Sequence, residues 1–237
     1  MKVRVLCLAL LFISPASLAL SSPAQKNNTA SLTHVISDYR RLLAARPVDY
    51  SLQEKKQLPG VMLRRYLLNS QQWSPQGVVS PERWQNGVDI YIPESARETH
   101  ALVVINNGSN NKGSGIPAEP TNFTEQELAR IAVATRTVVI SVSNVPNQVL
   151  NYQGMAKPLA EDDSVAYSWK LFAGDPEKYR NISLHIPMAA SVSQAFRLAK
   201  QEPMPQKISR FIATGASKRG WAAWLTALSD PDFDAVV

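Results

Sequence analysis

The sequence has 237 residues, of which 45% are hydrophobic and 19% are charged, and this balance is typical of a globular protein with one sizeable core. Its formal net charge is +6, but the basic residues are scattered, as at Arg40–Arg41 and Lys55–Lys56, and do not form the basic stripe that a nucleic-acid surface needs. Beyond the N-terminus there is no apolar run of roughly 18 residues, so we expect no internal membrane span.

Residues 1–22 have the layout of a secretory signal peptide. Lys2 and Arg4 give a positive start, Val5–Ile13 is a short apolar run, and small residues at 17–21 offer cleavage sites. An N-terminal membrane anchor is the alternative, but the run is short for a bilayer. We therefore expect export to the periplasm or the medium, with no membrane span after cleavage.

The single cysteine, Cys7, lies inside this predicted signal. Cleavage would leave a chain without a disulfide, a thiol nucleophile or a cysteine metal site. The acidic run Glu161–Asp163 has no histidine or spaced partner, so acids at a helix start explain it better than metal ligands do. We expect neither a metal nor a cofactor.

Residues 23–33 are polar and predict a flexible lead-in, followed by one domain over 34–237. Hydrophobic spacing predicts a helix over 32–43 and strands over 61–68 and 88–92. Further along, strands and helices alternate. The predicted strands are 101–106, 137–142, 208–214 and an opening strand at 235–237, and the predicted helices are 124–133, 161–172, 187–200 and 218–228.

This alternation predicts an α/β fold with a mostly parallel sheet and helices on both faces. Thr124 and Glu127 have the spacing of a capping box, which marks the start of one helix. In the last helix, one apolar face is predicted from four large residues at helical spacing: Trp221, Trp224, Leu225 and Leu228.

The segment that carries chemistry joins the strand 208–214 to the helix 218–228. A serine on such a turn, here Ser217, presents its hydroxyl above the sheet as a nucleophile elbow. The amide of Lys218 would then supply half of an oxyanion hole. The pattern departs from Gly-x-Ser-x-Gly because Arg219 stands where the second glycine is expected, and the glycine follows at Gly220. The alternative is a serine in an ordinary strand-to-helix loop.

The other half of an oxyanion hole should come from the loop after the third strand, so the amides of Asn107 and Gly108 are candidates. A turn that uses the conformations of Asn and Gly is the alternative. In this fold the triad order is serine, acid, histidine, whereas the three histidines, His34, His100 and His185, all precede the serine. The later acids, at 230, 232 and 234, lie too close to it, so the chain holds no complete triad.

The segment Thr214-Gly-Ala-Ser-Lys-Arg-Gly-Trp221, with Trp224-Leu-Thr226 and Asp230-Pro231, resembles the PhoPQ-activated pathogenicity-related family of exported, α/β-hydrolase-like proteins. Supporting stretches lie upstream: Val145–Gln148, Glu161–Asp162, Ala166–Tyr167, Trp169, Pro187–Met188 and Ser191–Val192. The resemblance implies an α/β-hydrolase fold, Ser217 as the nucleophile, and a link to virulence and to resistance against antimicrobial peptides. Members extend further, so this chain resembles a C-terminally truncated one, with a fold incomplete at the C-terminus.

The pattern Gly-x-Ser-basic-x-Gly is also similar to that of carbohydrate glucuronoyl esterases, with Lys218 in the basic position. Three hypotheses follow. The first is hydrolysis of an ester or amide by Ser217, with a small-molecule, peptide or carbohydrate ester as the unidentified substrate. The second is a hydrolase-like protein that binds or signals without turnover. The third is an inactive truncated remnant.

Overall fold

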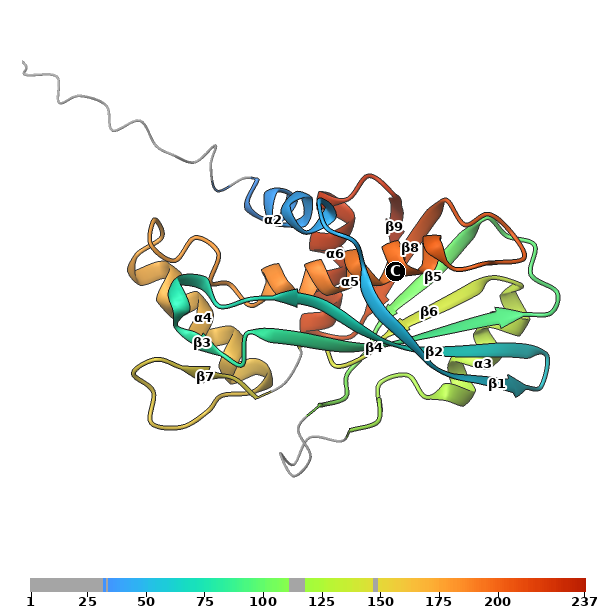
Figure 1. The fold of residues 1–237 in the computed structure, drawn as a ribbon, viewed down its shortest axis with the longest axis horizontal. Helices are drawn as coiled ribbons and strands as arrows, with labels where there is room; N and C mark the ends of the chain where they lie inside the picture. The colour runs from blue at the N-terminus through green and yellow to red at the C-terminus, as the bar shows by residue number, and fades with distance from the viewer. Residues whose placement is uncertain (1–31, 33, 111–117, 147–148) are drawn as a thin grey trace, which may run out of the picture.

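The computed structural model describes residues 32, 34–110, 118–146 and 149–237. The predicted signal peptide and most of the lead-in lie outside the described residues. Most elements surround one large twisted sheet, with the chain's C-terminus beside its last strand (Figure 1). No helix in the described part of the chain is long and apolar enough to cross a membrane.

The central sheet has seven strands in the order β1-β2-β4-β6-β5-β8-β9. Their bounds are β1 Asp49–Leu58, β2 Val61–Gln72, β4 Arg83–Pro93, β5 His100–Ile105, β6 Val138–Val142, β8 Arg210–Gly215 and β9 Phe233–Val236. The pairs β5–β6, β5–β8 and β8–β9 are parallel, whereas β1 and β4 run against their neighbours. Two short strands, β3 (Val79–Ser80) and β7 (Asn151–Tyr152), pair separately.

Helices cover both faces of the sheet, as Figure 1 shows. On one face α3 (Glu125–Thr135) packs against β2, β4 and β6. On the other, α5 (His185–Gln201) and α6 (Lys218–Ser229) pack against the sheet, and α2 (Val35–Ala44) packs on both of them. The helix α4 (Glu161–Gly174) lies near β3 and β7 at one end of the molecule. The predicted α/β class with a mostly parallel sheet is confirmed.

The core forms because the inner strands carry apolar residues toward both faces. Val138, Val139 and Ile140 in β6 are fully buried, although successive side chains in a strand point to opposite sides. The predicted capping box is also present, since the Thr124 amide donates to Glu127 at 2.8 Å and the Thr124 hydroxyl accepts from the Glu127 amide. Burial on both faces therefore fixes the middle of the sheet.

The strand β1 was not predicted from the sequence. Its residues, Asp-Tyr-Ser-Leu-Gln-Glu-Lys-Lys-Gln-Leu, are mostly exposed and have no clean alternation of apolar and polar side chains. It lies at the edge of the sheet, where charged residues protect unpaired backbone from other chains. Its pairing with β2 gives it its structure, and no local pattern marks that pairing.

The four large residues that form the predicted apolar face of α6 do not pack against the sheet. Trp221, Trp224 and Leu228 are 48%, 58% and 79% exposed. The buried side carries the smaller residues Ala222, Ala223 and Thr226, together with Arg219. Small side chains let the axis of α6 approach the sheet and α5 closely. The side of α6 that packs against them is therefore the one with the smallest side chains and not the most hydrophobic one.

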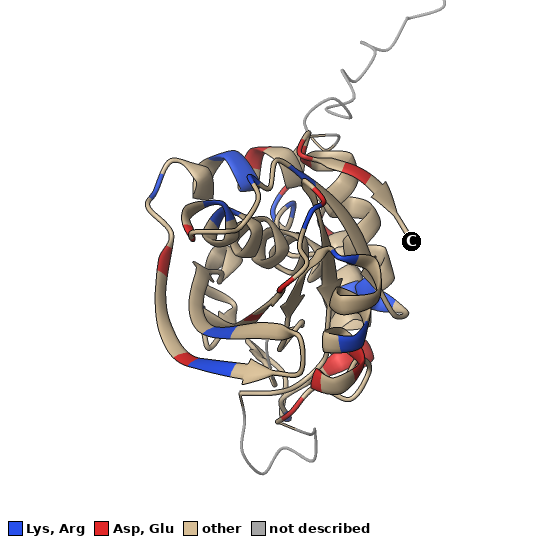
Figure 2. Cartoon of the chain, turned by 90° about the vertical axis from the view of Figure 1, so that its right-hand side faces the viewer, with Lys and Arg blue, Asp and Glu red and all other residues tan. Residues whose placement is uncertain are grey.

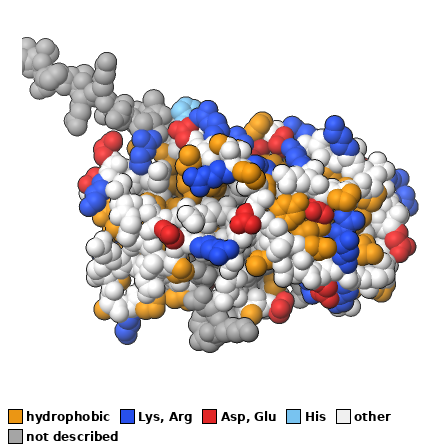
Figure 3. Space-filling view, in the orientation of Figure 1, with side chains coloured by type: hydrophobic (Ala, Val, Ile, Leu, Met, Phe, Trp, Pro, Cys, Tyr) orange, Lys and Arg blue, Asp and Glu red, His pale blue; other side chains and the backbone are white. Residues whose placement is uncertain are grey.

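Charges of both signs are interspersed along the chain, as Figure 2 shows for the ribbon. In the face drawn in Figure 3, blue and red side chains alternate among apolar and neutral ones. One cluster on the α3 side joins Arg65 to Glu54, Asp89 and Glu125. The absence of nucleic-acid binding stays a prediction.

Candidate functional site

Ser217 lies on the sharp turn that leaves β8 and begins α6. Its backbone has φ 55° and ψ −123°, a combination that non-glycine residues adopt at a cost and that clusters at functional sites. The side chain is exposed at the carboxyl end of β8. The turn therefore lifts the hydroxyl out of the sheet, as a nucleophile elbow requires.

Two glycines allow this turn to be tight. A Cβ atom on Gly220 would lie 2.8 Å from the carbonyl oxygen of Gly215, and a Cβ on Gly215 would lie 2.7 Å from the backbone carbon of Arg219. Neither contact is tolerated between real atoms. Gly220 thus performs the close strand–helix approach that the usual pattern assigns to a glycine one position earlier.

The loop after β5 lies beside this turn, because β5 pairs in parallel with β8 and Ile105 stands opposite Gly215. The buried Asn106 shapes the loop: its side-chain oxygen accepts from the Asn107 amide at 3.0 Å, and its side-chain nitrogen donates to the Phe123 carbonyl at 2.8 Å. The Asn107 amide is therefore engaged within the loop. The backbone amides of Asn107 and Gly108, which are the candidates for the oxyanion hole, lie at the same edge of the sheet as Ser217.

Gly108 has a backbone φ of 111°, which only glycine adopts readily. A Cβ there would lie 2.7 Å from the side-chain oxygen of Asn144 and 2.9 Å from the Ala118 carbonyl oxygen. The backbone at Gly108 therefore lies tightly between Asn144 and Ala118. Since the Asn107 amide is already bonded, the Gly108 amide is the better candidate of the two.

The two cations that follow Ser217 are both inside the structure. The side chains of Lys218 and Arg219 are 10% and 6% exposed, and both reach Glu161 at the start of α4. The Lys218 ammonium lies 2.8 Å from Glu161 and 2.8 Å from Asp162. The guanidinium of Arg219 donates to both oxygens of Glu161, at 2.9 and 3.0 Å. Both side chains are therefore largely shielded from water.

Hydrogen bonds extend this ion cluster to the neighbouring loops. Arg219 also donates through Nε to the carbonyl of Val145. The amide of Val145 in turn donates to the Asn106 carbonyl at 3.3 Å, and the Asn144 amide donates to the Asn107 carbonyl at 3.0 Å. The start of α4, the turn at Ser217 and the loop after β5 are therefore held together.

The sequence did not predict this role of Glu161. It places acids at the first turn of α4, and the structure agrees with that prediction. Nothing in the sequence, however, brings residue 161 beside residue 219, because the contact depends on the course of the chain after β6. In the described residues no group of three or more His, Cys, Asp or Glu side chains could hold a metal ion.

The histidines are placed away from the Ser217 hydroxyl or are otherwise engaged. His100 lies 3.0 Å from Asp234, a pairing that resembles part of a triad. It begins β5, however, so it lies about 16 Å from the edge at which Ser217 stands, at about 3.3 Å a residue. His34 precedes α2 and is exposed. These two are surface residues.

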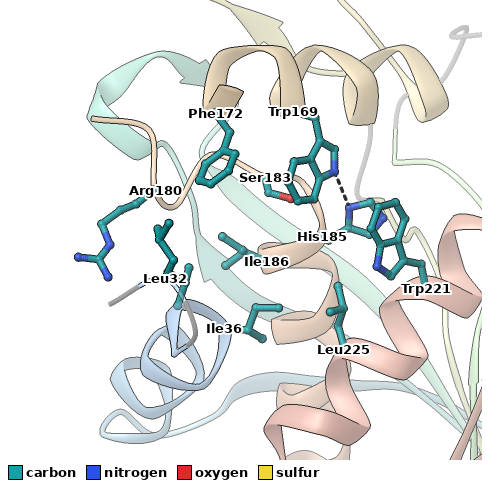
Figure 4. Close-up of a pocket in the computed structure, with 11 residues that line it drawn as sticks. Leu32, Ile36, Trp169, Phe172, Arg180, Ser183, His185, Ile186, Trp221 and Leu225 are labelled. Atoms are coloured by element: carbon teal, nitrogen blue, oxygen red, sulfur yellow. Dashed lines mark hydrogen bonds between the residues drawn. The ribbon is translucent and has the colours of Figure 1, made fainter. Parts of the chain in front are cut away.

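His185 is 1% exposed and is the first residue of α5. Its Nδ1 accepts from the indole Nε1–H of Trp169 at 3.3 Å, and its ring packs 4.0 Å from that of Trp221, centre to centre. Burial lowers the pKa of His185 to about 4, so the ring is neutral at pH 7. It is a packing residue against Trp169 and Trp221 (Figure 4).

Known proteins show the family to which the chain belongs. The family model described as "PhoPQ-activated pathogenicity-related protein" matches residues 36–237. The chain belongs to this family. Autocrine proliferation repressor protein A of Dictyostelium discoideum is 26% identical over 172 residues, which are 72% of this chain and 33% of that protein. The chain thus spans about a third of the length of this curated relative.

Solved esterase structures share the fold. Acetyl xylan esterase from Paenibacillus sp. R4 superposes with a TM-score of 0.53 at 12% identity, covering 90% of this chain and 60% of that one. Glucuronoyl esterase from Solibacter usitatus gives a TM-score of 0.50 at 12% identity, covering 96% and 63%. At such identities the likeness concerns the fold alone, and the chain has the α/β-hydrolase fold.

Proposed function

We propose that the complete protein is an exported serine hydrolase that cleaves an ester or amide through Ser217. One observation carries the proposal: Ser217 stands at positive φ on a glycine-framed turn between β8 and α6. Structures seldom retain such strain without a use for it. The helix that begins at Lys218 also directs its positive end toward charge that develops at the hydroxyl.

In this proposal the Ser217 oxygen attacks the substrate carbonyl. The amides of Lys218 and Gly108 donate hydrogen bonds to the oxyanion, and the alcohol or amine leaves as the acyl-enzyme forms. Water then releases the acid. Both proton transfers require a base, and the histidines among the described residues do not supply one at this edge. The proposal therefore requires a base from another part of the protein.

Support for an ester comes from the names of the structural neighbours, which are acetyl xylan and glucuronoyl esterases. Support for export comes from the layout of residues 1–22. The family name supports a link to pathogenicity. A carbohydrate-linked ester outside the cytoplasm is thus the substrate class that we propose first.

A second candidate is a hydrolase-like protein that binds a ligand without turnover. The observation that favours it is the pairing of the two positive charges nearest Ser217 with Glu161 and Asp162. With those charges compensated, little net positive charge is left at the turn. Turnover by the complete protein separates the two candidates.

The test is hydrolysis of 4-nitrophenyl acetate by the complete protein and by its Ser217→Ala variant. We expect the variant to lose at least about 1,000-fold in kcat, since the nucleophile is removed. The matched control is Ser51→Ala, because Ser51 is exposed on β1, at the other edge of the sheet. Equal rates for Ser217→Ala and the wild type would exclude Ser217 as the nucleophile.

A further inference from the structure

The strand β4 carries one fully buried asparagine, although this strand is not one of the elements that form the proposed site. Asn86 is 0% exposed and stands on the strand face that otherwise carries Trp84, Val88 and Ile90. These four side chains point to the same side of the sheet, because successive side chains of a strand alternate. An amide in such a place costs free energy unless its polar atoms have partners. The use of the Asn86 amide therefore follows from its partners.

Both acceptors of the Asn86 nitrogen lie in the segment that follows β6. Its Nδ2 donates to the carbonyl of Ser143 at 3.0 Å and to that of Asn144 at 3.1 Å. Its Oδ1 accepts from the Ser70 hydroxyl at 2.7 Å. The opposite orientation of the amide would place an oxygen against two carbonyl oxygens. The partners thus fix the side chain with its donors toward the segment after β6.

The backbone after β6 needs these donors because the pairing of strands stops there. The register between β4 and β6 ends at the pair Val88–Val142. At Asn144 the backbone turns away with a φ of 61°, a conformation that few residues other than glycine adopt readily. A buried carbonyl requires a donor wherever the ladder ends. Asn86 supplies that donor from its side chain and so holds the turn at Asn144.

Asn144 joins this turn at two points to the loop after β5, residues 106–110, which is called the oxyanion loop below. Its amide donates to the Asn107 carbonyl at 3.0 Å, and its side-chain Nδ2 donates to Oδ1 of Asn110 at 2.5 Å. Gly108 lies between these two points along the chain and packs against the Asn144 side chain. Asn144 therefore determines where the Gly108 amide lies.

The other end of Asn86 is anchored on α5. The register of β2 against β4 shifts at Ser70, and such an irregularity redirects a side chain. The Ser70 hydroxyl lies 3.2 Å from that of Ser191, which donates to the Pro187 carbonyl at 3.0 Å within α5. Asn86 thus connects the oxyanion loop to a buried helix on the opposite side from the proposed substrate.

We propose that Asn86 is a positioning residue for the oxyanion hole, an inference that rests on the proposed function. Asn86 is buried and does not touch the substrate. It holds the carbonyl of Asn144, and Asn144 keeps the Gly108 amide directed at the charge that develops on the substrate carbonyl. A donor of this kind acts only at hydrogen-bonding distance, and a misplacement of about 1 Å can cost about 100-fold in rate.

The test measures kcat and KM of the complete protein for 4-nitrophenyl acetate. We expect Asn86→Ala to lower kcat at least about 10-fold while KM changes less than about 3-fold, because the oxyanion hole stabilises the transition state and not the bound substrate. The value of kcat is expressed per folded molecule, from circular dichroism at the assay temperature. A residue that only supports the fold would lower the folded fraction and leave this kcat unchanged.

Two further variants separate positioning from stability. Ser193→Ala is the matched control, because its buried hydroxyl on α5 donates to Asp230, at the opposite end of α6 from Ser217. It should lose stability and keep kcat. Asn144→Gly suits the positive φ, so the fold is retained, but it removes the donor to Asn110. Its kcat should fall at least about 3-fold.

Unaltered kcat in folded Asn86→Ala would overturn the inference. If that variant does not fold, unaltered kcat in Asn144→Gly would overturn it instead. An equal fall of kcat in Ser193→Ala would also overturn it, since loss of any buried hydrogen bond would then suffice. Failure of the proposed function gives a different result: the wild type cleaves no ester, or cleaves it as fast as Ser217→Ala does.

Discussion

Ser217 is followed by two cations that pair with two carboxylates of a distant element, Glu161 and Asp162. Glu161 accepts from Arg219 and pairs with Lys218, and both cations are largely shielded from water. A buried charge that loses its partner is strongly destabilising. Glu161 is thus a positioning residue for the turn, because it fixes the two residues that follow the nucleophile candidate.

We predict that Glu161→Ala lowers the free energy of unfolding by about 2–4 kcal/mol, since it leaves Arg219 buried and unpaired. Urea unfolding measures this value. Asp163→Ala is the control, because Asp163 occupies the same first turn of α4 and is exposed. That variant should change stability by less than about 0.5 kcal/mol. Equal effects of the two substitutions would contradict the role given to Glu161.

His185 predicts a pH dependence of stability. Its pKa falls from 6.5 to about 4 on folding, because burial disfavours the charged form of the ring. The unfolded chain thus takes up the proton first on acidification, and folding loses stability as the pH falls from about 6.5 to 4. Relative to His185→Phe, the wild type should lose up to about 3 kcal/mol over this range. A constant difference from pH 7.5 to 4 would show that His185 is accessible to protons in the folded state.

At the scale of elements, α6 approaches the sheet through small residues. Gly215 and Gly220 touch backbone to backbone, and Ala222 and Ala223 are fully buried. The larger residues of the helix point outward or toward α4. The short distance between α6 and the sheet therefore determines both the shape of the turn at Ser217 and the position of Trp221.

We predict that Gly220→Ala destabilises the fold by about 1–3 kcal/mol, because the new methyl group meets the Gly215 carbonyl oxygen at 2.8 Å. This outcome opposes the helix propensity of alanine, which alone would favour the variant by about 1 kcal/mol. Gly174→Ala, at the end of α4, meets nothing within 4 Å and should be neutral or slightly stabilising. Thermal unfolding of both variants measures the difference, and a stabilised Gly220→Ala would show that the turn is looser than described.

The elements differ in how far the sequence predicts them. Buried strands such as β5 and β6, and the capped helix α3, follow from continuous apolar runs and the Thr124–Glu127 spacing. The edge strand β1 and the packed face of α6 do not. The strand β1 depends on its pairing with β2, and the packed face of α6 depends on how closely the helix approaches the sheet. The periodicity of a single sequence carries information on neither.

At the scale of the whole molecule, the site is also only partly predictable. Ser217 and the loop at Asn107 and Gly108 follow from the order of strands and helices, since adjacent parallel strands end at one edge. The contact of Glu161 with Arg219 arises from a long connection whose course the sequence does not reveal.

Export is a property of the whole chain and has its own test. We predict that the mature protein begins between residues 20 and 23, after removal of the segment with Lys2, Arg4 and Cys7. Intact-mass measurement of protein from a periplasmic or culture-medium fraction would give the first residue. An unprocessed chain with residue Met1 in the membrane fraction would indicate an anchor instead.

The central claim, that Ser217 is a nucleophile, is tested most directly by covalent labelling of the complete protein with a fluorophosphonate. Peptide mass spectrometry identifies the modified residue without knowledge of the substrate. We predict a single label on the peptide that contains Ser217, lost in Ser217→Ala and retained in Ser51→Ala. Labelling of Ser217→Ala to the same extent as the wild type would contradict the claim.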